Sequence, residues 1–349
     1  MKKLTVKKLI AASTIGFVAL GSITACSRPE EKADGQAANT QESTASSSAP
    51  ERISLEDFDQ LVHAGPVASD DAIAGNTWAA EIKKRGNLKY GGASTSPIFS
   101  LEDIKTGRNT GFDAGIASLL AHYILGDDIP LKDQIDFQGV STDTREPLLQ
   151  NGTLDAVIAT YSITPERLEK INYAGPYYSS GLTIMTAKDN TDITSLKDLD
   201  GKKVAAQSSS TALPVLQEKV PSAQVTTFTD NTACLTAVRQ GSVDAYVQDQ
   251  AILLSALAND SNSGLKIVGE PFSDDLYGIG LSKDDADAVE FVNQFLADIE
   301  KDGTWKKLWD ATVGSFLQQD APEPPTLGDF GEAGTSANQP SGKESSEEK

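Results

Sequence analysis

The stretch LQNGTLDAVIAT at residues 149–160 recurs in outline as VRQGSVDAYVQD at residues 238–249. Each copy predicts the end of a helix, a stop at Gly152 or Gly241, and then an apolar strand of the kind buried in a parallel sheet. The offset between the two glycines is 241 − 152 = 89 residues. The repeat therefore favours two lobes with related helix–strand units, although two common helix–glycine–strand turns could also match by chance.

Strands and helices alternate on both sides of this stretch. A helix begins at Phe112 and ends at Gly126, and a second helix covers residues 145–150. Predicted strands cover residues 88–91, 135–140, 155–160, 203–207 and 245–248. This alternation indicates an α/β fold, and 349 residues at roughly 150 per domain indicate about two domains.

Charge and composition exclude several classes of protein. The chain has 30 Lys+Arg against 50 Asp+Glu, a formal net charge of −20. This argues against a nucleic-acid binder, which needs a basic face, and against electrostatic binding to anionic lipid. Two Cys and two His exclude a Cys/His-rich zinc site and a disulfide scaffold. We expect no metal and no cofactor.

Residues 1–25 are typical of an export signal, with four Lys before an apolar stretch of about a dozen residues, too short to span a bilayer. An N-terminal membrane anchor is the alternative. Residues 23–26 resemble the lipobox of bacterial lipoproteins. The resemblance implies cleavage before Cys26 and a lipid on its sulfur; a stray Cys after an ordinary signal is the alternative.

The next residues are low in apolar side chains, and residues 27–50 contain no Leu, Ile, Val or aromatic residue. We expect a disordered tether at 26–50, an N-terminal extension at 51–78 and a disordered acidic tail at 321–349.

The first predicted lobe offers hydroxyls and cations beside the end of strand 155–160. Thr160, Ser162 and Arg167 suit a carboxylate, because a guanidinium binds one bidentately and hydroxyls donate to the same oxygens. A solvated Arg at a helix start is the alternative. Arg145, shortly after Thr142, begins the preceding helix and could reach the same place. Its alternative is a surface ion pair with Asp143 or Glu146.

The second predicted lobe offers a hydroxyl-rich loop, 208–211, before a helix. Such a loop suits an anion, with simple N-capping by Ser210 or Thr211 as the alternative. Asp249 ends strand 245–248 and could bind an ammonium group, unless it only caps a loop. Together these residues favour an amino acid bound between two lobes, where small-molecule sites are common, without a catalytic step.

At these residues the chain resembles the family 3 solute-binding proteins of ABC importers, over about residues 80–315. The motifs that carry the resemblance lie at residues 111–113, 160–167, 173–181, 195–204 and 241–249. Within the family it is most similar to the glutamate-binding lipoproteins of actinobacteria. The resemblance implies a type II periplasmic-binding-protein-like fold. The expected lobes are 79–185 plus 274–320 and 186–273, joined by crossing segments near 183–188 and 270–276.

The resemblance also implies residue roles. Arg167 would bind the α-carboxylate of the ligand with help from Thr160, Ser162 and Thr211, and Asp249 would bind the α-ammonium. In relatives that bind acidic amino acids, an Arg 22 residues before the carboxylate Arg contacts the side-chain carboxylate. Arg145 has this spacing, since 167 − 145 = 22, and favours glutamate, with aspartate as second candidate and glutamine if Arg145 points away. The full expected ligand set is Thr142, Arg145, Thr160, Ser162, Arg167, Ser210, Thr211 and Asp249.

The expected protein is a monomeric substrate-binding lipoprotein and not an enzyme. It would be lipid-anchored on the extracytoplasmic face of the cell membrane and would deliver its ligand to permease subunits driven by an ATPase. The alternatives are a ligand-sensing lipoprotein, and a periplasmic dehydratase on the same fold with Asp249 as the acid/base group. Cys234 is expected to be a buried, unpaired thiol.

Overall fold

The computed structural model describes residues 52–260 and 262–331. The predicted signal, Cys26 and the tether lie outside the described residues, as does the predicted tail beyond residue 331. None of the helices in the described ranges has the length and apolar character needed to cross a membrane.

The first lobe is built on a five-stranded mixed sheet. β1 pairs in parallel with β5 and β6, while β13 runs antiparallel to β6 and β7. A small antiparallel sheet of β2, β3 and β4 lies in the same lobe. The strand order of the main sheet is β5 (Ile135–Gly139), β1 (Leu88–Gly92), β6 (Ala156–Val157), β13 (Asp275–Leu281) and β7 (Asn172–Ser180). The short strands are β2 (Thr95–Ser96), β3 (Ser100–Asp103) and β4 (Arg108–Thr110).

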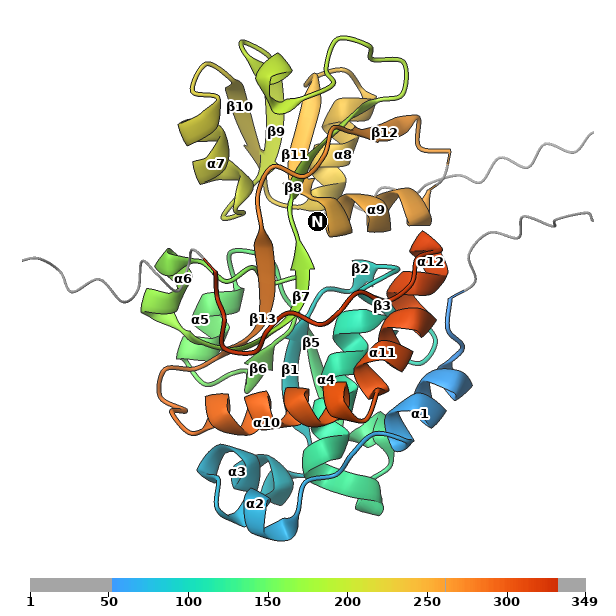
Figure 1. Ribbon diagram of the computed structural model, residues 1–349, viewed down its shortest axis with the longest axis vertical. Coiled ribbons are helices and arrows are strands. Elements are labelled where there is room, and N and C mark those ends of the chain that lie inside the picture. The colour runs from blue at the N-terminus through green and yellow to red at the C-terminus, as the bar shows by residue number, and fades with distance from the viewer. Residues whose placement is uncertain (1–51, 261, 332–349) are drawn as a thin grey trace, which may run out of the picture. The chain divides into compact units, whose positions relative to one another are not determined.

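The second lobe repeats the plan of the main sheet. β11 pairs in parallel with β9 and antiparallel with β8, as β6 does with β1 and β13. The order is β10 (Gln224–Phe228), β9 (Lys203–Gln207), β11 (Ala245–Asp249), β8 (Leu182–Ala187) and β12 (Leu265–Val268). Both five-stranded sheets are visible, one in each lobe (Figure 1).

The internal repeat seen in the sequence is therefore structural and not a chance match. Its two strands, β6 and β11, hold the third position of their sheets. Each follows a helix, α5 or α8, through a glycine in the left-handed region, with φ 71° at Gly152 and 66° at Gly241. Side chains other than glycine adopt this conformation rarely, which explains the glycine in both copies.

Helices surround both sheets. In the first lobe they are α1 (Leu55–His63), α2 (Asp70–Ala74), α3 (Thr77–Arg85), α4 (Phe112–Leu125), α5 (Arg145–Gln150), α6 (Pro165–Lys170), α10 (Ala288–Lys301), α11 (Thr304–Trp309) and α12 (Ser315–Leu317). In the second lobe they are α7 (Ala212–Lys219), α8 (Asn231–Arg239) and α9 (Gln250–Asn259). Helical turns of other types are η1 (Gly126–Asp128), η2 (Leu131–Asp133), η3 (Leu196–Leu199) and η4 (Asp310–Gly314).

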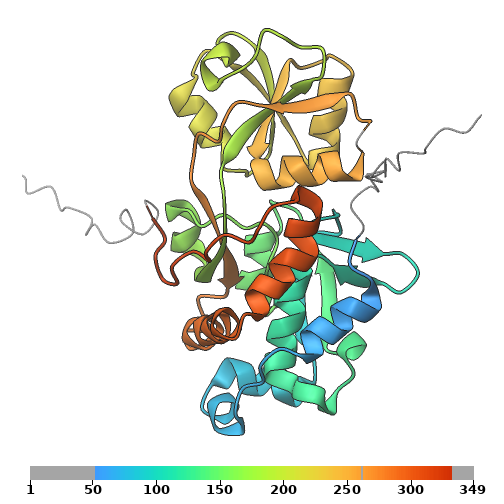
Figure 2. The ribbon, with the colours of Figure 1, turned by 45° about the vertical axis from the view of Figure 1, so that its right-hand side comes forward.

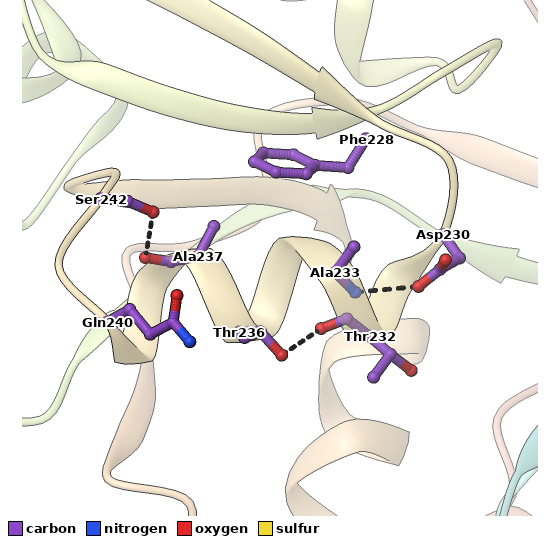
Figure 3. A pocket seen from close by; sticks show the side chains of 8 residues that line it. All are labelled: Phe228, Asp230, Thr232, Ala233, Thr236, Ala237, Gln240 and Ser242. Atoms are coloured by element: carbon purple, nitrogen blue, oxygen red, sulfur yellow. Dashed lines mark hydrogen bonds between the residues drawn. The ribbon is translucent and has the colours of Figure 1, made fainter. Parts of the chain in front are cut away.

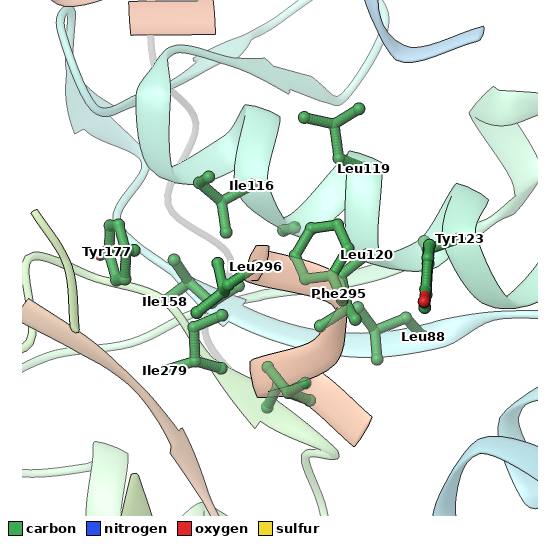
Figure 4. Close-up of a cluster of buried hydrophobic side chains, with 14 of the residues drawn as sticks. Leu88, Ile116, Leu119, Leu120, Tyr123, Ile158, Tyr177, Ile279, Phe295 and Leu296 are labelled. Atoms are coloured by element: carbon green, nitrogen blue, oxygen red, sulfur yellow. The ribbon is translucent and has the colours of Figure 1, made fainter. Parts of the chain in front are cut away.

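The core of the first lobe forms around α4. Almost every residue of this helix is buried, including the predicted apolar positions Ile116, Leu119 and Leu120. Figure 4 shows these side chains beside Phe295 and Leu296 of α10 and residues of the sheet. A helix buried on nearly all sides is expected to be mostly apolar, and α4 is, with Asp113 and His122 as its buried polar exceptions.

The two lobes are joined by two crossing segments that run between the sheets (Figure 1 and Figure 2). The first is Gly181 between β7 and β8, and the second is residues 269–274 between β12 and β13. The first crossing thus precedes the predicted 183–188, and the predicted lobe boundary at 185 is too late. The apolar run Leu182–Ala187 is a buried strand of the second sheet, paired on both sides, and not a linker.

Both ends of the described chain pack on the first lobe. Phe58 and Val62 of the predicted extension are fully buried in its core. After α12, the Gly328 N–H donates to the Gly175 carbonyl at 2.8 Å, and Phe330 packs on the first lobe. The packed chain therefore continues past residue 320, and the predicted start of a disordered tail at 321 is too early.

Candidate functional site between the two lobes

Two arginines lie at the inner edge of the first lobe. Arg145 begins α5 and Arg167 lies in α6, and the two residues are only 5% and 7% exposed. Their guanidinium carbons lie 3.9 and 5.0 Å from the centroid of the Tyr161 ring. Arg145 Nη1 donates to the Ala159 carbonyl at 3.2 Å, and Arg167 Nη1 donates to the Ser162 carbonyl at 2.7 Å. An aromatic face and strand-end carbonyls thus hold both cations in place.

Neither arginine behaves as an ordinary surface cation. Within the described residues, Arg145 forms no ion pair with Asp143 or Glu146, and its buried Nε has no hydrogen-bond partner. Burial, and next the charge of Arg167, lower the pKa of Arg145 to about 10. The guanidinium is therefore charged at neutral pH in a place that disfavours its charge. The surface-ion-pair alternative for Arg145 and the solvated alternative for Arg167 are both wrong.

A loop of the second lobe, residues 208–211, reaches the first lobe beside these arginines. Arg167 Nη2 donates to the Ser209 carbonyl at 2.9 Å, and Thr142 Oγ1 donates to the Ser208 carbonyl at 2.8 Å. The hydroxyls of Ser208 and Ser209 both donate to the Asp143 carboxylate, at 3.0 and 2.5 Å. Arg167 and Thr142, both predicted from the sequence, are thus brought against the second lobe.

The hydroxyls that follow in this loop do not cap α7. Ser210 Oγ donates to the Gln207 carbonyl at 2.7 Å. Thr211 Oγ1 is buried and has no partner among the described residues, and α7 has no side-chain cap bond. The simple N-capping alternative is wrong, and Thr211 keeps a free hydroxyl at the start of the helix.

Asp249 ends β11 and is 3% exposed. It makes no side-chain cap bond to α9, so the loop-capping alternative is also wrong. Its buried Oδ1 has no partner in the described chain. Burial, followed by the charge of Asp275, raises the pKa of Asp249 well above its usual range, while Arg167 and Arg145 oppose this rise. A buried carboxyl of this kind is satisfied by a cation such as an ammonium group.

Thr160 and Ser162 flank Tyr161 just beyond β6. Thr160 has φ 45°, and its N–H donates to Asp113 Oδ2 at 2.8 Å, while Asp113 also accepts from the Tyr177 hydroxyl at 2.9 Å. The Gly111-Phe112-Asp113 motif therefore acts by holding the Thr160 backbone in a rare conformation. Thr160 Oγ1 donates to the Ala159 carbonyl, and Ser162 is buried at 3% exposure.

Sequence reasoning missed two aromatic residues of this region. The guanidinium groups of both arginines lie over the Tyr161 ring. Tyr277 on β13 has a buried hydroxyl without a partner in the described part of the chain. Burial, and next the charge of Asp249, raise the pKa of Tyr277 well above its usual value. Its ring stacks on Tyr178 at 5.4 Å. In the sequence, Tyr161 follows directly after the predicted strand 155–160 and Tyr277 lies between two uncharged residues, and only the fold brings them to the arginines and Asp249.

A surface hollow lies over α8, lined by residues other than these (Figure 3). Its polar groups serve the helix: Asp230 accepts from the Ala233 N–H, Thr236 donates to the Thr232 carbonyl, and Ser242 donates to the Ala237 carbonyl. The lobe interface, in contrast, presents buried polar atoms from both lobes that have no partner within residues 52–260 and 262–331, including Arg145 Nε, Thr211 Oγ1 and Asp249 Oδ1. It is therefore the stronger candidate site.

Two related α/β lobes, two crossing segments and charged groups at the interface define a two-lobed binding protein. The chain belongs to the bacterial extracellular solute-binding proteins, family 3, whose model matches residues 88–314. The family resemblance and the fold class predicted from the sequence are confirmed.

Two relatives in the family are named for different amino acids, glutamine and glutamate. The chain is 32% identical over 231 residues to the ABC transporter glutamine-binding protein GlnH of Bacillus subtilis, covering 66% of this chain and 82% of that protein. It is 29% identical over 257 residues to the glutamate-binding protein GluB of Corynebacterium efficiens, covering 72% and 86%.

Solved structures agree with this assignment. An ancestral arginine-binding protein bound to glutamine has a TM-score of 0.60 and 34% identity, over 66% of this chain and 99% of that one. An ancestral amino acid-binding protein, a precursor of cyclohexadienyl dehydratase, has a TM-score of 0.58 and 33% identity, over 67% and 98%.

Proposed function

We propose that the chain is the extracytoplasmic receptor of an ABC importer for an acidic amino acid, with glutamate favoured and aspartate as the second candidate. The main support for the proposal is the guanidinium of Arg145, which is buried beside Arg167 and forms no ion pair with any of the described residues. Arg145, Arg167 and Asp249 match the two carboxylates and the one ammonium group of such a ligand. The other carboxyls nearby have partners in the protein: Asp275 accepts from Ser273 Oγ, and Glu146 lies 3.2 Å from Lys170 Nζ and 3.9 Å from Arg167 Nε.

In this proposal Arg167 binds the α-carboxylate, with the hydroxyls of Thr160, Ser162 and Thr211 beside it. Asp249 binds the α-ammonium, and Arg145 with Thr142 binds the side-chain carboxylate. Ser210 shapes the loop through its bond to the Gln207 carbonyl. A glutamine side chain would leave the charge of Arg145 uncompensated, and an unpaired buried charge is costly.

The bonds between the lobes support binding by closure. Thr142, Asp143 and Arg167 bond to the loop at 208–211, so a ligand between these groups touches both lobes only when the lobes are together. Such a ligand shifts the population toward the closed form, which the permease of the importer would recognise. Lipid anchoring through Cys26, a monomeric state and a location at the cell membrane complete the proposal.

Calorimetric titration of the mature protein with the twenty amino acids tests the proposal. The protein is first unfolded, dialysed and refolded, so that no amino acid from the expression host competes. Glutamate and aspartate are expected to bind most tightly; strong binding of glutamine without glutamate would contradict the acidic-ligand assignment. Loss of labelled glutamate uptake on deletion of the gene separates transport from sensing.

A dehydratase is the second candidate, because a relative of similar fold is a precursor of one and because Asp249 has the raised pKa of an acid/base group. Incubation with a cyclohexadienyl substrate distinguishes it. We expect no turnover, since the arginines and hydroxyls are all used in binding.

A further inference from the structure

The only two histidines of the chain meet on the first lobe. His63 is the last residue of α1, and His122 lies in the last turn of α4. Their rings are 5.7 Å apart, centroid to centroid, and nearly perpendicular. Asp127, in η1 directly after α4, adds a carboxylate to the pair. Two segments of the chain, α1 and the continuous stretch of α4 and η1, thus bring three side chains of metal-ligating types to one place, near α1 and α4 (Figure 1).

The donor atoms converge. His63 Nδ1 lies 3.0 Å from Asp127 Oδ1, His122 Nδ1 lies 4.0 Å from the same oxygen, and one donor atom of each residue lies within 4.8 Å of the others. Donor atoms around a tetrahedral zinc ion are roughly 3.4 Å apart, given bond lengths of about 2.0–2.1 Å. The side chains of His63 and Asp127 are 50% and 75% exposed, so both are free to make the remaining adjustment.

His122 supplies an independent indication of a ligand. It is 1% exposed, and its buried Nδ1 has no hydrogen-bond partner among the described residues. This nitrogen is the His122 atom that lies 4.0 Å from Asp127 Oδ1, so it faces the other side chains of the cluster. Lys83 donates to the Leu125 carbonyl and lies 4.0 Å from Asp128, the neighbour of Asp127.

We propose that His63, His122 and Asp127 form a zinc-binding site, with solvent in the fourth position. Two imidazoles and a carboxylate are a donor set that zinc accepts, and imidazole disfavours calcium and magnesium. The composition excludes a Cys/His-rich site but not this one. Bound zinc would fasten α1, the first helix after the predicted tether, to α4 in the core. The site stands apart from the arginines and does not depend on the proposed amino-acid ligand.

The test measures zinc affinity of the mature protein, made without a histidine tag, by competition with a chromophoric chelator. About one zinc per chain is expected. His63→Ala and Asp127→Asn should each weaken binding by roughly 100-fold, since each removes a direct ligand. Asp128→Asn is the matched control, an exposed acid in the same turn, and should bind zinc as the wild type does. His63→Ala and Asp127→Asn both replace exposed residues, so the test does not depend on replacing buried His122.

Two further readouts complete the test. Saturating zinc should raise the melting temperature of the wild type but not of His63→Ala, because only a ligand of the folded state stabilises it. Cobalt substituted for zinc should give the visible absorption of a tetrahedral site. The proposal is overturned if His63→Ala binds zinc as tightly as the wild type, or if calcium and magnesium bind with the same affinity as zinc.

Discussion

Replacing Arg145 by Met is predicted to separate ligand affinity from folding stability. Burial and Arg167 lower the pKa of Arg145 from 12.5 to about 10. At about 1.4 kcal/mol per pKa unit, the charged guanidinium costs the folded state roughly 3 kcal/mol at any pH below about 10. Met removes this cost, but it also removes the bond to the Ala159 carbonyl and the stacking on Tyr161. These two contacts are worth roughly 2–4 kcal/mol together. The free energy of unfolding should therefore stay within about 1 kcal/mol of the wild type.

The affinity for glutamate and aspartate should change far more. Without Arg145, the side-chain carboxylate of the ligand is buried without a partner, which costs roughly 3 kcal/mol, or about 150-fold in Kd. Glutamine, which has no such charge, should bind as well as before or better.

Calorimetry with glutamate, aspartate and glutamine measures the affinities, and chemical denaturation of the ligand-free protein measures the stability. Arg239→Met is the matched control, because Arg239 forms an exposed pair with Asp260 and lies in the other lobe. Unchanged glutamate affinity in a folded Arg145→Met protein would refute the reasoning. A loss of stability of about 4 kcal/mol would show that Arg145 is mainly a structural residue.

The other predictions concern neighbouring groups. Arg167→Ala should abolish calorimetric binding of every amino acid, because it removes the proposed α-carboxylate partner and the bond to Ser209; retained binding would exclude that role. The pKa of Asp249 is raised in the free protein and should fall when an ammonium group binds. Binding should therefore release protons, and it should weaken as pH falls through that raised pKa. Binding heats measured in phosphate and Tris buffers should differ for the wild type and agree for Asp249→Asn. Tyr277→Phe removes a buried hydroxyl that has no partner in the described part of the chain. It should weaken glutamate binding roughly 10-fold in a titration and leave the stability of the free protein unchanged in denaturation. Burial raises the pKa of Cys234 to about 12, so mass spectrometry should find it alkylated by iodoacetamide only after unfolding.

The bounds of a helix or strand were predictable from the sequence where nearby residues mark its ends. The helix at 145–150 and the strand at 203–207 have the predicted bounds, because Pro147 and the hydroxyl-rich loop mark their limits. Cys234 is free and buried, as predicted. The family resemblance was needed to prefer Arg145 over a surface residue, since the spacing of 22 has no meaning without it.

Features that depend on distant contacts were not predictable. The apolar run at 182–187 reads equally well as a hinge or a strand, and only its pairing with β11 and β12 decides between them. Tyr277 reaches the site because β13 returns from the second lobe into the first sheet. The two histidines are 59 residues apart (122 − 63), and nothing in the sequence near either one indicates the other.

The crossing segments have a mechanical consequence. The Leu182 N–H donates to Ser273 Oγ at 2.8 Å, and the Phe272 N–H donates to the Leu182 carbonyl at 2.9 Å, so the two segments are tied together where they pass. A β-carbon placed on Gly181 would lie 2.2 Å from the Ser273 carbonyl oxygen. Because two segments bound at one point resist sliding but permit rotation, we expect the lobes to move mainly by rotation about this point. A pair of fluorophores placed far from this point, one on each lobe, would convert that rotation into a large change in energy transfer.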